Sequence, residues 1–233
     1  MMEIKTVADA YQRSAQVALF RNVYLWMTMA LAITGLTALI VSDSYAIQQM
    51  IFTNQMVWWG LLIAELALVW YLSVRIQRLS FASATCMFIV YSILNGATLS
   101  VILLVYTAES IASTFFITAG TFAAMSLIGY FTKKDLSSMG SLLFMALIGL
   151  IIATVVNLFM KSETLYYILS YAGVIIFVRL TAYDTQKIKR MLLSEGVEVN
   201  DTTRKVALMG ALALYLDFIN LFLYLLRLLG NRR

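Results

Sequence analysis

The chain has 233 residues, of which 62% are hydrophobic and only 12% charged, and its formal net charge is +5. A soluble domain carries about twice that charged fraction, so the composition excludes an ordinary soluble protein. There is no histidine and only one cysteine, which excludes an intrachain disulfide and removes the usual pH-sensing side chain and transition-metal ligand. Apart from the basic charge, nothing points to nucleic-acid binding.

Hydrophobic segments long enough to cross a bilayer recur along the chain. A transmembrane helix needs about 20 mostly apolar residues. The segments that meet this requirement are residues 22–42, 56–74, 81–105, 111–131, 138–160, 164–183 and 206–229. They are apolar on every side, whereas the strands of a membrane β-barrel alternate polar and apolar residues. We therefore predict an all-α, polytopic membrane protein whose single domain of seven transmembrane helices covers residues 22–229.

The two ends of the chain flank this domain. Residues 1–21 are polar and contain no evident signal-cleavage site, so the first span is expected to be retained. They are interpreted as a cytoplasmic tail that is either flexible or a helix lying on the membrane surface. Residues 230–233 are predicted to form a short basic C-terminal tail.

Lysine and arginine residues are unevenly distributed among the connecting segments. The N-terminal tail and the connectors after the second, fourth and sixth spans hold twelve of them, whereas the alternate connectors hold only Lys161. Because cytoplasmic loops are enriched in these residues, this predicts a cytoplasmic N-terminus. The C-terminal end disagrees, since a full seventh crossing places Arg227, Arg232 and Arg233 outside. A re-entrant last segment would avoid the conflict, but its length favours a full crossing.

The last span contains an acid, Asp217, near its centre. A carboxylate there costs roughly 2.5–3.5 kcal/mol on insertion scales, which makes it a functional-site hypothesis. The alternative is that Asp217 only bonds a neighbouring hydroxyl or arginine and locks the bundle. Small and polar residues recur on one face of this helix, namely Gly210, Ala213, Asp217, Asn220, Tyr224 and Arg227. Because a polar face is disfavoured against lipid, we predict a central last helix wrapped by the other six.

A second acid, Asp184, lies at the cytoplasmic end of the sixth span. Alone it would be an ordinary interfacial residue, but the next helix carries Asp217. Two carboxylates in a low-dielectric site cannot both ionise cheaply, so a pair in contact would share a proton and respond to pH. Its oxygen atoms would also form a weak Ca²⁺ site. Because Asp217 lies deeper in its span, contact would require an invaginated cytoplasmic end or a displaced last helix.

Further polar residues are candidates for an ion path or a latch. Glu65, midway along the second span, is interpreted either as a ligand on a cation path or as the partner of a buried arginine. Asn95 and Asn220 are candidates for the same path, although helix packing is the alternative for Asn95. Arg75 and Arg78 follow at the end of the second span, where they either anchor the helix at the interface or latch the carboxyl pair.

Several of these motifs together resemble the transmembrane Bax inhibitor motif family (Bax inhibitor-1 like), and the chain is identified as a bacterial member. The residues that carry the resemblance are Tyr183-Asp184 before a basic loop, Leu214–Phe222 (LYLDFINLF), Leu225–Arg227 and Lys133–Leu136. The resemblance covers essentially the whole length. It implies a central last helix and a pH-dependent Ca²⁺ leak, with Asp184 and Asp217 as pH sensor and Glu65 on the ion path. The family also has an arginine latch at the end of the second helix, but neither Arg75 nor Arg78 aligns with it unambiguously.

We therefore expect a pH-sensitive, calcium-permeable leak channel in the bacterial inner membrane, rather than an enzyme. Ca²⁺ is expected as the permeant ion, with no cofactor, and the lipid bilayer and H⁺ as partners. One alternative is an interaction protein that modulates other membrane proteins, such as a membrane protease. A second is a proton-coupled transporter, because paired acids also serve as proton relays. An intramembrane aspartyl protease is disfavoured, since the proline-containing motif of those enzymes cannot occur here. The oligomeric state is left open.

Overall fold

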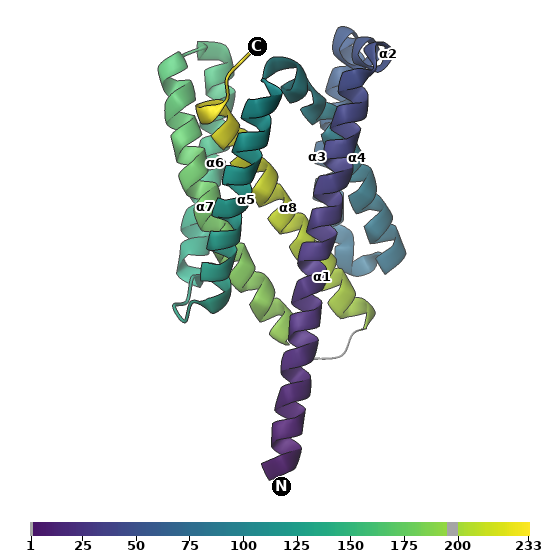
Figure 1. Ribbon diagram of the computed structural model, residues 1–233, viewed down its shortest axis with the longest axis vertical. Coiled ribbons are helices and arrows are strands. Elements are labelled where there is room, and N and C mark those ends of the chain that lie inside the picture. Colours follow the sequence, from purple (N-terminus) through teal and green to yellow (C-terminus); the bar gives the residue numbers. More distant parts are fainter. Residues whose placement is uncertain (1, 195–199) are drawn as a thin grey trace. The chain divides into compact units, whose positions relative to one another are not determined.

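The computed structural model describes residues 2–194 and 200–233, with side chains from Val17 onward except that of residue 194. The chain divides into two compact units. Unit 1 comprises residues 1–105 and 190–215, and unit 2 comprises residues 106–189 and 216–233. The last two helices of the chain therefore contribute residues to both units (Figure 1).

Unit 1 contains the helices of the first half of the chain. They are α1 (Met2–Asp43), α2 (Tyr45–Gln48), a π-helical turn (Gln49–Thr53), α3 (Gln55–Arg75), a 3₁₀ turn (Ile76–Arg78) and α4 (Phe81–Val105). Asn54 caps α3, because its side chain accepts hydrogen bonds from the first backbone N–H groups of that helix. On α4, a Cβ at Gly96 would overlap Thr34 of α1. The glycine therefore allows the two helices to approach closely.

Unit 2 contains most of the second half of the chain. Its helices are α5 (Ala108–Phe131), α6 (Ser137–Met160), most of α7 (Glu163–Ser194) and the second part of α8 (Asp201–Leu229). A cluster of buried apolar side chains joins α6, α7 and α8, and its members are Leu143, Leu150, Leu169, Phe177, Leu180 and Leu221. These side chains are the core of the unit.

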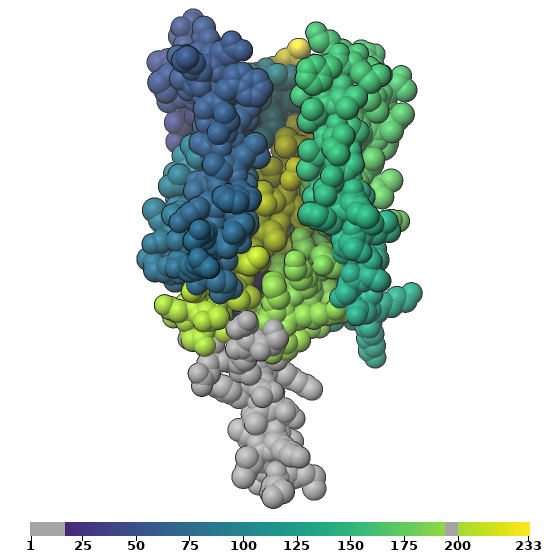
Figure 2. Space-filling view, turned by 180° about the vertical axis from the view of Figure 1, so that it is seen from behind, coloured from purple at the N-terminus to yellow at the C-terminus, as the bar shows by residue number. Residues whose placement is uncertain are grey.

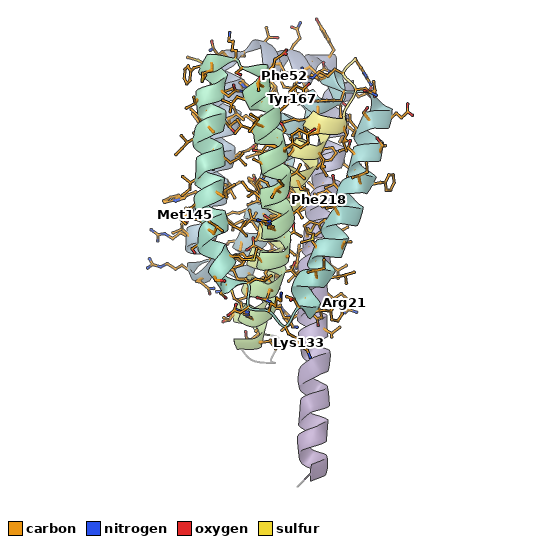
Figure 3. The ribbon with its side chains drawn as sticks, turned by 90° about the vertical axis from the view of Figure 1, so that its left-hand side faces the viewer. Arg21, Phe52, Lys133, Met145, Tyr167 and Phe218 are labelled. Carbon is orange, nitrogen blue, oxygen red and sulfur yellow. The ribbon has the colours of Figure 1, made fainter. Side chains whose placement is uncertain are left out.

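The outer side of α6 is apolar and exposed. Only 11% of its most apolar stretch is buried. This helix is the green column in Figure 2, and Met145, labelled in Figure 3, points away from the unit. An apolar surface of this kind is too large for a soluble monomer but is what contact with lipid requires.

Seven of the described helices are long and apolar enough to cross a membrane. Each of them contains one of the seven predicted spans, and the described elements are all helices. The prediction of an all-α, polytopic membrane protein is therefore confirmed.

The last helix, α8, is the most buried of these spans. In its most apolar stretch 72% of the residues are buried, compared with 11–39% in the other spans. Within unit 1 it packs through Tyr215 against Phe88 and Tyr91, and within unit 2 through Phe218 against Phe115. This burial is what an inner last helix requires, whereas its wrapping by all six other helices stays a prediction.

The helix that contains the sixth predicted span is longer than the span itself. The span is predicted to end at residue 183, whereas α7 continues to Ser194. The polar residues after Asp184 lower the hydropathy, but one face stays packed, because Thr185, Ile188 and Leu192 are all buried. Helical spacing of three and four residues places these side chains on one face, which extends the helix.

At the N-terminal end, α1 runs from Met2 to Asp43 without a break at residue 22. The side chains before Val17 lie outside the described residues. The predicted placement of residues 1–21 on the membrane surface therefore stays a prediction, as does the cytoplasmic side of this end.

Candidate functional site

The two acids on α7 and α8 meet within unit 2. The carboxyl groups of Asp184 and Asp217 lie within hydrogen-bonding reach of each other. Asp217 is 4% exposed, whereas Asp184 is partly buried. The buried Oδ2 atom of Asp217 receives no hydrogen bond from the N–H and O–H donors of the described residues. Because ionised carboxylates only accept, a hydrogen bond between these two groups requires a proton on one of them.

The extension of α7 explains how the acids meet despite the depths expected from the sequence. Asp184 lies inside a helix that ends at Ser194, rather than at the helix end. In addition, α8 begins at Asp201, which is earlier than predicted. The connection between the two helices therefore lies well beyond both acids.

Two glycines bring neighbouring helices close to α7 directly before Asp184. A Cβ at Gly129 of α5 would overlap the backbone of Ala182, and a Cβ at Gly140 of α6 would overlap the ring of Tyr183. At Gly129 a larger side chain would force α5 and α7 apart, whereas at Gly140 it would displace the Tyr183 ring. The depth and rotation of Asp184 are thus set by close packing on two sides of α7.

Partly buried hydrogen bonds hold α7 just after Asp184. The Gln186 amide donates to the carbonyl of Lys134 at 2.8 Å and accepts from the backbone N–H of Leu136 at 2.9 Å. One turn later, the Lys189 ammonium donates to the carbonyl of Tyr130 at 2.8 Å and lies 4.4 Å from the centre of that ring. These contacts fix α7 to the end of α5 and to the turn that leads into α6.

A basic side chain lies near the pair, and aromatic rings pack beside it on α8. Lys187, one turn after Asp184, is the basic group that acts on it. On α8 the residue after Asp217 is Phe218, whose ring meets Phe115 and Phe122 of α5 edge-on at 5.5 and 5.4 Å. Figure 3 shows Phe218 between Lys133 and Tyr167, which mark the two ends of unit 2.

The pair is small for a resident metal site. Among the described residues there is no group of three or more carboxylate, histidine or cysteine side chains that could hold a metal ion. Because Ca²⁺ takes about six to eight oxygen ligands, two carboxyl groups suit a transient contact with a cation better than tight binding.

A second buried acid, Glu65 on α3, lies in unit 1. It is 9% exposed and accepts hydrogen bonds from Thr98 Oγ1 and from Asn95 Nδ2, the latter at 3.5 Å. Both donors are on α4 and both are neutral. The predicted ion-path residues Glu65 and Asn95 are therefore brought together by a direct hydrogen bond.

The hydrogen bonds continue from Asn95 to α8 and α1. The hydroxyl of Tyr215 donates to Asn95 Oδ1 at 3.0 Å and lies 2.7 Å from Thr34 Oγ1, which is 3.0 Å from the carbonyl oxygen of Ser92. This buried network, which we call the unit 1 polar network, is made of Glu65, Thr98, Asn95, Tyr215 and Thr34. It links four helices. Thr34 was not predicted as part of a site, because no spacing pattern connects it to Tyr215.

The other predicted site residues lie elsewhere. Asn220 donates through Nδ2 to the carbonyl of Leu216 on its own helix at 2.8 Å, which satisfies its amide locally. Arg75 ends α3 and Arg78 ends the following 3₁₀ turn, and both are exposed. These arginines belong to unit 1 and the carboxyl pair to unit 2, so the latch stays a prediction.

Comparison with known proteins agrees with the seven-span structure. The inhibitor of apoptosis-promoting Bax1 family matches residues 16–233. The inner membrane protein YbhL of Escherichia coli is 55% identical over 214 residues, which cover 91% of each chain. Uncharacterized proteins of Rickettsia prowazekii and Borreliella burgdorferi are 46% and 44% identical and cover 91% of this chain. The matches span 89% and 91% of those two relatives, respectively. The chain therefore belongs to the inhibitor of apoptosis-promoting Bax1 family.

Proposed function

We propose that this protein is a pH-sensitive, calcium-permeable leak channel, gated by the carboxyl pair Asp184–Asp217. The observation that carries the proposal is the contact between these two carboxyl groups on neighbouring helices. The inner-membrane relative supports a location in the bacterial inner membrane, and the distribution of lysine and arginine supports a cytoplasmic N-terminus.

The contact links the protonation of the pair to the position of two helices. With one proton, a hydrogen bond joins α7 to α8. Without it, two negative charges face each other in a low-dielectric site, and their repulsion is relieved only by separation or by a cation. Ca²⁺ prefers carboxylate oxygen atoms among protein ligands. A change of pH therefore alters both the helix contact and the attraction for the permeant ion.

Glu65 is proposed as a second acid along the ion path. Its carboxylate is held by the neutral donors Thr98 and Asn95 rather than by a basic side chain. Its negative charge is therefore not cancelled by these two partners and can attract a cation. Asn95 acts in this proposal as a positioning residue, because it holds Glu65 and is held by Tyr215.

The test is Ca²⁺ flux into dye-loaded proteoliposomes from roughly pH 5 to 8, around the range in which coupled carboxyl groups change charge. The proteins are wild type, Asp184→Asn, Asp217→Asn and the double variant. An asparagine amide can donate to the remaining carboxylate at any pH, so the hydrogen bond no longer needs a proton. Each single variant should flatten the pH dependence, and the double variant should add little. Asp201→Asn, at the exposed start of α8, is the control and should behave like wild type.

Other outcomes point to the alternative functions. If flux is absent, the channel proposal fails, and an interaction protein would be favoured, because its activity does not need the carboxyl pair. If flux is equally pH-dependent in all variants, gating by the carboxyl pair fails. Uphill Ca²⁺ movement driven by a proton gradient would instead identify a proton-coupled transporter.

A further inference from the structure

The basic residues at the C-terminal end of the chain break the pattern set by the other connectors. The helix α8 runs without a break to Leu229. As a result, both Arg227 and Arg232 lie at the same end of unit 2 as Lys161. With a cytoplasmic N-terminus this is the outer end, where lysine and arginine are scarce. Residues that violate a general sequence rule are often retained for a function.

A cavity of about 470 Å³ lies at this end, marked by Tyr167 in Figure 3. It is built entirely from unit 2. Among the side chains that line it, three are cationic and one is acidic, and two are tyrosines. These six are Lys161, Arg227, Arg232, Glu163, Tyr166 and Tyr167. The cavity is therefore basic, although the helices around it are apolar.

Aromatic contacts hold both arginines in place. The Arg227 guanidinium lies over the rings of Tyr166 and Tyr224, 5.6 and 5.0 Å from their centres. Arg232 donates through Nη2 to the hydroxyl of Tyr166 at 3.2 Å and lies over the ring of Tyr106. A guanidinium stacked on a ring keeps its N–H groups free at the edges for an anion.

The backbone around Arg232 is also fixed. Its neighbour Asn231 accepts a hydrogen bond from the N–H of Thr107 at 3.1 Å and donates to Ser110 Oγ at 2.9 Å. Arg232 itself forms a β-bridge with Tyr106. The C-terminal segment is therefore bound to the start of α5, and its basic side chain is preorganised rather than part of a free tail.

The other side of the cavity is the connection between α6 and α7. Lys161 ends α6 with a left-handed backbone, φ 51°. The next residue, Ser162, donates its N–H to Asn157 Oδ1 at 3.1 Å, and its hydroxyl accepts from the N–H of Leu165 at 3.3 Å. Because α7 begins at Glu163, the positive end of a long helix dipole adds to the basic side chains.

We propose that this cavity binds a phosphate-bearing anion, supplied either as the headgroup of an acidic phospholipid or as free phosphate. Planar guanidinium groups recognise phosphate through paired hydrogen bonds, and Lys161 adds a third positive charge. Tyr166 and Tyr167 belong to the aromatic belt that lies at the level of lipid headgroups. The site is independent of the Asp184–Asp217 gate, so its test uses binding rather than flux.

The experiment measures thermal unfolding of the full chain in an uncharged detergent. The probes are dioctanoyl phosphatidylglycerol, dioctanoyl phosphatidylcholine and inorganic phosphate, each titrated to saturation. The test variant is the double change Lys161→Asn and Arg232→Gln. Both side chains are exposed, and asparagine tolerates the backbone conformation at position 161. The control variant, Lys133→Gln with Arg233→Gln, removes two exposed charges of unit 2 that do not line the cavity.

Phosphatidylglycerol should raise the unfolding temperature saturably, and its Kd should weaken by at least about tenfold in the test variant. The control should stay within about twofold of wild type. Phosphatidylcholine should not produce the saturable shift. Saturable binding of inorganic phosphate alone would assign the site to free phosphate instead of lipid. The proposal is overturned if neither anion stabilises wild type, or if the test variant binds them as wild type does.

Discussion

In unit 1 the buried acid Glu65 accepts hydrogen bonds from Thr98 and Asn95, whereas in unit 2 Asp217 faces a second acid. Neutral donors can satisfy a carboxylate whether or not a proton is available. The contact between Asp184 and Asp217 differs, because its hydrogen bond forms only when the two groups share a proton. Burial of an acid is thus not sufficient for a pH switch. The nature of the partner decides whether the contact changes with pH.

The largest effect is expected from a substitution that separates Asp184 from Asp217 in unit 2. Gly129→Val should lower the free energy of unfolding by more than about 3 kcal/mol, because the new side chain overlaps the backbone of Ala182, which cannot rotate away. It should also remove the pH dependence of flux. Denaturant unfolding in detergent gives the first quantity and proteoliposomes give the second.

Gly120→Val is the matched control on the same helix. A Cβ at Gly120 meets nothing within 4 Å, so only a helix-propensity change within about 1 kcal/mol is expected. Equal losses of stability in the two variants would show that close approach of α5 to α7 does not position Asp184.

A smaller effect is expected from removing one donor to the acid of unit 1. Thr98→Val should cost about 1.5–3 kcal/mol, because a hydrogen bond to a charged group is lost in a buried site. Thr98→Ser keeps the hydroxyl and should recover most of this loss. The pH dependence of flux should remain in both variants. If Thr98→Val abolished it, the proton-dependent step would not be confined to the carboxyl pair.

The smallest effect is expected at the far end of the unit 1 polar network. Tyr215→Phe keeps the ring contacts with Phe88 and Tyr91 but removes the hydroxyl between Asn95 and Thr34. The loss should be about 1 kcal/mol in unfolding free energy. Tyr71→Phe, at an exposed position of α3, is the comparison and should be neutral within about 0.5 kcal/mol. A neutral Tyr215→Phe would mean that the network does not contribute to stability.

The sequence predicted the bounds of a helix well where the helix is apolar along its whole length. The predicted span 81–105 matches α4, since its whole length is apolar. The end of α7 could not be predicted in this way. Hydropathy reports how apolar a segment is, and the polar residues beyond Asp184 hide a face that is still packed through Ile188 and Leu192.

The two polar sites also differ in how far they could be predicted from the sequence. Asp184 and Asp217 could be paired from the sequence because they lie on consecutive helices. Thr34 and Tyr215 are 181 residues apart, and neither type of side chain is unusual in a membrane helix. Their hydrogen bond depends on how α1 and α8 are packed in unit 1, which no local pattern encodes. The cavity at Lys161 was also missed, although the misplaced arginines at the C-terminal end were its signal.

The exposed face of α6 determines which substitutions this helix can accumulate over evolutionary time. A fluid hydrocarbon fits around any side-chain shape, so exposed positions such as Met145, Ile152 and Phe159 are constrained in polarity but not in volume. Substitutions among apolar residues should therefore accumulate there almost neutrally. Gly140, at the start of the same helix, lies against the Tyr183 ring, which any larger side chain would displace, so its volume is constrained. A single helix should thus combine the most variable and some of the least variable positions of the chain.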